Sequence, residues 1–210
     1  MVVGMDVLLA DPQVARVPVR ECGEPLVELS SVGVPCRAIG TAARVRLGVA
    51  VRLAAAQRSL PPGTGLLVVE GFRTAASQAA IVARYRAVVE AEYPGAEPAE
   101  VERLTSRFVA PVHVAPHVAG AAVDVTLTGP DGELWMGTDI DATPEESDGC
   151  CFTDASGLTE PLRTRRRLLA DALGAVGFVN YPTEWWHYSF GDRYWALVTG
   201  ADAARYGPLS

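Results

Sequence analysis

A carboxylate inside an apolar run is the first place where this sequence could do chemistry. Asp124 lies between Val123 and Val125 in the stretch PHVAGAAVDVTL, residues 116–127, which also contains His117, one of three histidines in the chain. Burying a carboxylate in such a run is unfavourable unless a cation or strong hydrogen-bond donors meet it. A metal ion would be such a cation, and the stretch therefore suggests a metal site.

Asp124, His117 and His187 together form a possible ligand set. Two imidazoles and one carboxylate leave the fourth position of a tetrahedral zinc ion for water. His117 and Asp124 are seven residues apart, so a continuous strand would point them to opposite faces. Gly120 can supply the bend that reunites them. The alternative is that each histidine is a packed or hydrogen-bonded residue without a metal.

Glu184 precedes His187 by three residues, in the stretch TEWWHYSF. Zinc lowers the pKa of a bound water molecule from about 16 to roughly 7, and a neighbouring carboxylate is the usual general base of zinc hydrolases. Glu184 could take the proton from that water and return it to a leaving amine. Taken alone, an acid three residues before a histidine also arises by chance.

His113 offers a competing ligand pair, because it stands four residues before His117. On a helix this spacing would place both rings on one face, as in the His-Glu-x-x-His proteases. Pro111 and Pro116 disfavour a helix there. We therefore expect His113 to be structural or to support a metal ligand.

The elements that must position these residues follow from apolar periodicity and turn residues. The helix that begins at Thr74 or Ser77 has one apolar stripe, made of Ile81, Val82, Tyr85, Val88 and Val89. Helices are expected over 41–57, from 74 or 77 to before 94, over 98–108 and over 161–176, and strands over 66–70, 122–128, 185–190 and 194–198, the last two joined as a hairpin by GDR. The predicted fold class is α+β, with a small antiparallel sheet flanked by helices.

The length of 210 residues suits a single domain over 1–210. Residues 1–40 have little periodicity and should form an extended arm with one or two short strands. Residues 136–160 carry many turn formers and acids, which predicts a long loop. Loops of this length are usually lids, binding loops or disordered segments.

The composition narrows the class of protein. A net charge of −7 argues against sequence-independent binding of nucleic acid or of an anionic membrane. The arginines within 163–167 are interpreted as a solvated helix face. Neither a signal peptide nor a membrane span is recognised, so a cytoplasmic location is expected. The four cysteines, which include no Cys-x-x-Cys pair, are expected to be free thiols: Cys22, Cys36, Cys150 and Cys151.

Four motifs in order carry a family resemblance: EGFRT, PHVAGAAVDVTL, MGTDID and EWWHYSFGDRYWA. Over nearly all of residues 20–200 the chain resembles the D-alanyl-D-alanine dipeptidases of the VanX type, within the zinc D,D-peptidase family that shares its fold with the hedgehog signalling domain. The resemblance implies that three residues bind Zn²⁺, that Glu184 is the general base, that Arg73 stabilises the oxyanion and that Asp141 binds the substrate amine. The implied zinc ligands are His117, Asp124 and His187.

The chain departs from this family pattern around the first predicted zinc ligand. Ala115 stands where the family usually has serine, and Val118 and Ala119 stand where it has polar residues. A lost hydroxyl contact typically costs about 0.5–1.5 kcal/mol. The departure bears on the identity of the substrate, D-Ala-D-Ala, more than on the reaction type, zinc-dependent hydrolysis of a peptide bond. Five aromatic residues near the C-terminus are interpreted as core packing and not as ligand stacking: Trp185, Trp186, Tyr188, Tyr194 and Trp195.

The sequence therefore predicts a cytoplasmic zinc metallopeptidase that hydrolyses a small D,D-dipeptide, most simply D-Ala-D-Ala, by a metal-bound hydroxide. One alternative is a D,D- or L,D-carboxypeptidase, or an amidase on a related dipeptide-like metabolite. Another is a non-catalytic zinc-binding module, against which Glu184 and Arg73 argue. The cellular role could be glycopeptide resistance, through depletion of a cell-wall precursor, or recycling.

Overall fold

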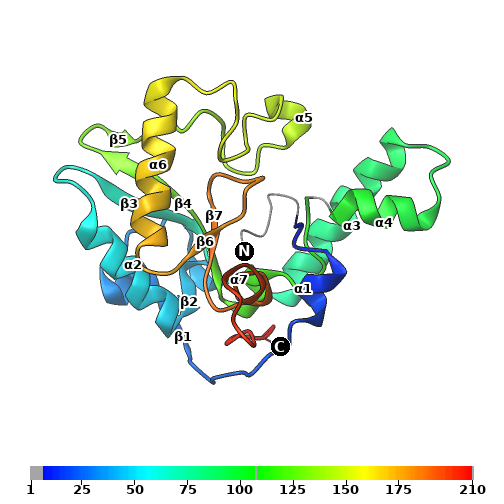
Figure 1. Ribbon diagram of the computed structural model, residues 1–210, viewed down its shortest axis with the longest axis horizontal. Helices are drawn as coiled ribbons and strands as arrows, with labels where there is room; N and C mark the ends of the chain where they lie inside the picture. Colours follow the sequence, from blue (N-terminus) through cyan, green and yellow to red (C-terminus); the bar gives the residue numbers. More distant parts are fainter. Residues whose placement is uncertain (1–6, 107, 210) are drawn as a thin grey trace.

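The computed structural model describes residues 7–106 and 108–209 (Figure 1). Its main sheet has the strand order β3-β4-β7-β6, with every neighbouring pair antiparallel, and β5 pairs with the end of β4. The strands are β3 (Gly65–Glu70), β4 (Ala122–Gly129), β5 (Gly132–Glu133), β6 (Val179–Asn180) and β7 (His187–Ser189). The predicted α+β class with a small antiparallel sheet is confirmed.

Strand β4 lies between β3 and β7 in this sheet. It is buried from Ala122 to Leu127, and Thr128 is partly exposed. Because consecutive residues from Ala122 to Leu127 are all buried, both faces of β4 are covered by protein, as the apolar run around Asp124 predicted. The predicted strand 66–70 is likewise present as β3.

The segment predicted as an extended arm contains a short helix and one strand of a second sheet. These are α1 (Pro12–Arg16) and β1 (Leu26–Glu28), followed by the 3-10 turns η1 (Leu29–Val32) and η2 (Gly40–Ala43). Strand β1 pairs antiparallel with β2 (Arg44–Arg46). The single strand agrees with the prediction for residues 7–40, whereas α1 was not expected, and residues 1–6 lie outside the described residues.

The pairing of β2 corrects the predicted helix over 41–57. Helix α2 spans Leu47–Ser59, and the seven residues before it form η2 and β2. Val45 lies in the predicted helical range but is in a strand, where it pairs with Val27 of the second sheet. Helix α2 buries Val49 and Leu53 and packs with α6 (Glu160–Gly174) over the apolar core of the main sheet (Figure 1).

Helices α3 (Ala75–Glu92) and α4 (Pro98–Ser106) form a pair that extends away from the main sheet (Figure 1). Helix α3 begins as predicted, because the Thr74 hydroxyl accepts a hydrogen bond from the Ser77 amide. Most of the predicted apolar stripe of α3 is not fully buried. In α3 only Gln78 and Val89 are buried, and Val88 is 52% exposed.

The predicted hairpin at the C-terminus is also wrong. Strand β7 is short, and the second predicted strand is helix α7 (Arg193–Thr199). The side chain of Asp192 accepts hydrogen bonds from the amides of Tyr194 and Trp195, at 2.8 and 3.1 Å, and this cap starts a helix in spite of the β-forming aromatic residues. The expectation of core packing is confirmed for the four of those aromatics that are buried: Trp185, Trp186, Tyr188 and Tyr194.

The predicted loop over 136–160 contains only the short helix α5 (Pro144–Ser147). It is nevertheless anchored, since Met136, Cys151 and Leu158 are buried. All four cysteines are free, as expected. Among the described residues, no helix combines the length and apolar character needed to cross a membrane.

Candidate metal centre

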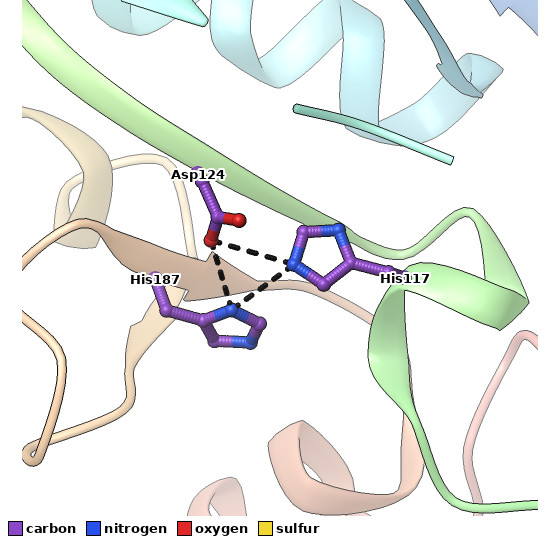
Figure 2. A group of neighbouring side chains, drawn as sticks. All are labelled: His117, Asp124 and His187. Atoms are coloured by element: carbon purple, nitrogen blue, oxygen red, sulfur yellow. Dashed lines mark hydrogen bonds and ion pairs between the residues drawn. The ribbon is translucent and has the colours of Figure 1, made fainter. Parts of the chain in front are cut away.

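Three buried side chains point toward one another: His117, Asp124 and His187 (Figure 2). Nδ1 of His187 lies 3.1 Å from Oδ1 of Asp124 and 3.2 Å from Nε2 of His117, and that Nε2 lies 3.4 Å from Oδ1 of Asp124. The structure therefore brings together the three residues that were predicted as zinc ligands.

Sheet register and one tight turn produce this triangle. Asp124 on β4 and His187 on β7 are directly opposite in the antiparallel ladder, so their side chains share a face. His117 lies in the 3-10 turn η3 (Pro116–Ala119), which ends at Gly120 with φ of 63°. This turn is the bend expected between His117 and Asp124, and a Cβ at Gly120 would lie 2.6 Å from Leu26.

The dimensions of the triangle suit a tetrahedral metal ion. Ligand atoms that each lie about 2.0–2.1 Å from a zinc ion are roughly 3.3–3.4 Å apart, which matches the observed edges of 3.1 to 3.4 Å. Nδ1 of His117 lies 2.6 Å from the carbonyl oxygen of Gly71. Because a carbonyl only accepts, Nδ1 donates, and Nε2 of the neutral ring offers its lone pair to the triangle.

Electrostatics keep Asp124 in the form that a metal ligand requires. Burial raises the pKa of this carboxyl group, but His117 and His187 outweigh burial through charge and hydrogen bonding, and they hold the pKa well below its usual range. For His117, burial lowers the pKa and Asp124 raises it, with a net increase. Asp124 is therefore a carboxylate that interacts with both rings, and its negative charge favours a divalent cation between the three side chains.

Glu184 lies at the edge of the triangle, with Oε2 3.8 Å from Nδ1 of His187 and its side chain 16% exposed. Burial raises the pKa of Glu184 to about 7, the carboxylates of Asp124 and Asp141 act in the same direction, and His187 opposes them. A carboxyl group with a pKa close to neutral can both accept and donate a proton, which is what a general base that later acts as an acid needs.

Arg73 follows β3 and is largely buried, with 15% of its side chain exposed. Its Nε and Nη2 donate to the carboxylate of Glu70 at 2.7 and 2.5 Å, and its Nη1 donates to Oε1 of Gln78 at 2.8 Å. Arg73 is thus oriented by a two-bond contact, unlike a flexible surface ion pair. Sequence reasoning missed Glu70 and Gln78, although an acid three residues before Arg73 was a visible signal.

All six predicted site residues line one cavity of about 360 Å³: Arg73, His117, Asp124, Asp141, Glu184 and His187. Asp141 lies at the exposed rim with φ of 68°, and partial desolvation, followed by the charge of Asp124, raises its pKa. Ala115 also lines the cavity. His113 is exposed and is absent from the metal-binding cluster of the described residues.

Asn180 is a second residue that sequence reasoning missed. Its Nδ2 donates to the carbonyl oxygens of Glu184 and His187, both at 3.0 Å, and its Oδ1 accepts from the hydroxyl of Thr153 at 2.6 Å. Asn180 therefore fixes the backbone that carries both the candidate base and one candidate ligand. Two of its partners follow within seven residues, but the third, Thr153, comes from a distant segment that only the fold brings near.

A buried His/Asp/His triangle, a carboxyl group of raised pKa and an oriented arginine in one cavity are the parts of a metallohydrolase site. Residues 38–200 match the family model described as D-ala-D-ala dipeptidase, and the chain belongs to this family of metallopeptidases. Membership in an enzyme family speaks against the alternative of a non-catalytic zinc-binding module.

Curated relatives include the D-alanyl-D-alanine dipeptidase of Synechocystis sp., which is 28% identical over 86% of this chain and 87% of that protein. The protein of the same name from Enterococcus faecalis is 33% identical, over 75% of each chain. Among solved structures, VanYB in complex with D-alanine-D-alanine has a TM-score of 0.47 at 20% identity and covers 85% of this chain and 82% of that chain. The LdcB LD-carboxypeptidase has a TM-score of 0.49 at 18% identity, covering 86% and 76%.

Proposed function

We propose that this protein is a zinc-dependent dipeptidase that hydrolyses a small D,D-dipeptide, with D-Ala-D-Ala as the first candidate. The observation that carries the proposal is the presence of the ligand triangle, Glu184 and Arg73 in one cavity of a chain that belongs to the D-ala-D-ala dipeptidase family. His117, Asp124 and His187 would hold the ion. Zinc bound there would acidify a water molecule and polarise the peptide carbonyl.

Glu184 and Arg73 would supply the remaining chemistry. The carboxylate of Glu184 would accept the proton of the attacking water and return it to the leaving amine, and its raised pKa in the metal-free chain supports this role. A guanidinium has five N–H donors, and Glu70 and Gln78 use three of those of Arg73. The two remaining donors can stabilise the oxyanion that develops on the substrate carbonyl.

Asp141 is proposed to bind the free amine of the substrate. Its carboxylate lies at the rim of the same cavity, and Ala115 offers no hydroxyl as an additional acceptor. The substrate ammonium would therefore depend on Asp141, which favours a dipeptide with an unblocked amino end. We further propose that the enzyme acts on the cytoplasmic dipeptide pool, where it would deplete a cell-wall precursor or recycle it.

The deciding experiment is an alanine-release assay on the purified protein with D,D-, L,L- and mixed dialanines, with and without a chelator. Hydrolysis of the D,D-dipeptide that stops on chelation and returns with added zinc is expected. Faster release of alanine from muropeptides than from the free dipeptide would favour the carboxypeptidase alternative. No metal-dependent release from any peptide would overturn the proposal.

A further inference from the structure

The catalytic cavity continues beyond the metal centre along helix α3. Past Arg73 its wall is made of five apolar or aromatic side chains, which we call the apolar arm: Ile81, Tyr85, Val88, Phe108 and Val109. A dialanine has the bulk of about five water molecules, roughly 150 Å³ at 30 Å³ each. The cavity of about 360 Å³ therefore has room for a larger substrate.

The apolar arm explains why the stripe of α3 is not buried in a core. Of the predicted stripe, Val89 is buried, whereas Ile81 and Tyr85 are half-buried and Val88 is exposed. The rings of Tyr85 and Phe108 lie 5.6 Å apart, so the wall is already formed by packed side chains. Apolar surface left open to water is unfavourable by about 25 cal/mol per Å², and an apolar ligand group would relieve this cost.

Charge indicates which half of a dipeptide enters the apolar arm. Arg84 also lines the cavity from α3 and has no acidic partner among the described residues. Asp141, the residue proposed to bind the amine, comes from the loop over 136–160 and not from the α3–α4 pair. A dipeptide has an ammonium group at one end and a carboxylate at the other. With the ammonium at Asp141, the carboxylate of the C-terminal residue would face the guanidinium of Arg84.

We propose that the apolar arm binds the side chain of the C-terminal residue of the substrate. The preferred substrates are then D,D-dipeptides with a bulky apolar C-terminal residue, such as D-Ala-D-Leu or D-Ala-D-Phe, in preference to D-Ala-D-Ala. This inference rests on the proposed dipeptidase function and deepens it, because it names the side-chain class that the site selects.

The first test uses the wild-type protein loaded with zinc, so it depends on no variant. We expect kcat/KM for D-Ala-D-Leu and D-Ala-D-Phe to exceed that for D-Ala-D-Ala by about tenfold, because each additional buried methylene adds favourable burial. D-Leu-D-Ala should show no such gain. Equal or better cleavage of D-Ala-D-Ala would overturn the inference and leave the proposed function intact. A gain with D-Leu-D-Ala in place of D-Ala-D-Leu would also overturn it, and cleavage of no dipeptide at all would overturn both.

The second test narrows the apolar arm by Val88→Trp. Val51→Trp on α2 is the matched control, because Val51 is also 52% exposed but does not line the cavity. Val88→Trp should lower kcat/KM for D-Ala-D-Phe at least tenfold more than for D-Ala-D-Ala, and Val51→Trp should change neither. Both replaced side chains are at exposed positions, and thermal unfolding checks that each variant folds. An unchanged ratio of the two substrates in folded Val88→Trp would overturn the inference.

Discussion

Asp124 is the residue on which the candidate metal site depends most. It is buried on a central strand, and its Oδ1 lies 3.1 and 3.4 Å from the imidazole nitrogens of His187 and His117. Such a carboxylate is stable only with its partners in place, since removing one partner leaves an uncompensated buried charge. The sequence feature that first suggested chemistry is therefore also the centre of the site.

Glu184→Gln separates metal binding from turnover. Glutamine has the same shape as glutamate and cannot accept a proton, and Glu184 is not a member of the ligand triangle. Because positioned general bases contribute about 10²–10⁴-fold, we expect kcat to fall by at least 10² while bound zinc stays stoichiometric. Alanine release and elemental analysis measure the two effects. His117→Ala, in contrast, should lose the metal. Near-normal turnover in Glu184→Gln would show that Glu184 is not the general base.

The raised pKa of Glu184 also predicts a pH-dependent stability of the metal-free protein. Its pKa is about 7 in the folded chain against an ordinary value of 4.5, so the folded state holds its proton more tightly. The contribution of Glu184 to the free energy of unfolding is fully present below pH 4.5. It is lost as the pH rises through 7, and the loss amounts to about 3 kcal/mol at most.

Glu184→Gln abolishes this titration. In denaturant unfolding without metal, the free energy of unfolding of the variant should therefore increase relative to that of the wild type between pH 5 and pH 8. Glu145→Gln, at an exposed glutamate, is the control and should follow the wild type. A constant difference between Glu184→Gln and wild type across this range would contradict the prediction.

The residues of the site could be predicted from sequence where their chemistry is unusual in its surroundings. Asp124 in an apolar run and the pairing of Glu184 with His187 are local signals, and the structure places all six predicted residues around one cavity. Their catalytic roles remain proposals. Gln78 and Asn180 were missed, because each also bonds to a segment that only the fold brings near: Gln78 to the carbonyl oxygen of Ala110 and Asn180 to the hydroxyl of Thr153.

At the scale of elements, the loop over 136–160 is held by helix α6 through Arg166. This side chain is 2% exposed and donates to the carbonyl oxygens of Met136, Phe152 and Cys150 at 2.8, 2.6 and 2.8 Å. Burial lowers its pKa to about 10. The interpretation of the arginine run as a solvated face is therefore wrong for Arg166. The loop in turn accepts a hydrogen bond from the Trp185 amide, next to Glu184.

Arg166→Gln should release this loop. Glutamine cannot reach three carbonyl groups at once, and each buried acceptor left unpaired costs about 1–3 kcal/mol. We expect a lower midpoint of thermal unfolding and faster proteolysis within residues 136–160, together with a lower kcat, because the backbone near Glu184 loses support. Arg167→Gln, at the exposed neighbour on the same helix, is the control. Equal protease resistance in Arg166→Gln and Arg167→Gln would show that the loop does not depend on Arg166.

Helices and strands were predicted correctly where one local sequence signal dominates. They were missed where two such signals favour different structures or where the pairing partner is distant in sequence. Strand β4 has a long apolar run, and α3 has a capping threonine, so both were located correctly. In α7, the Asp192 cap competes with aromatic residues that favour strands, and the cap prevails. In β2, the partner strand β1 comes from the arm, and a helical periodicity cannot reveal a pairing across that distance.

At the scale of the whole molecule, the metal centre would join segments that are far apart in the chain. Turn η3, strand β4 and strand β7 each contribute one ligand, and 70 residues separate His117 from His187. The sheet already brings them together, and outside the triangle the carbonyl oxygen of Gly71 holds the ring of His117. An ion at their centre would therefore stabilise the folded chain as a unit, since the unfolded chain has no such site.

Removing the metal should lower the thermal stability of the entire protein. Zinc at about 100 times its dissociation constant contributes about 2.7 kcal/mol, which for a chain of this size raises the midpoint of unfolding by roughly 5–10 °C. Differential scanning calorimetry of chelated and zinc-saturated protein measures the shift. His117→Ala should abolish the zinc-dependent shift because one ligand is lost, whereas Glu184→Gln should retain it because the triangle is intact. The same midpoint with and without excess zinc would show that these three side chains do not form a metal site, and the proposed hydrolase mechanism would lose its foundation.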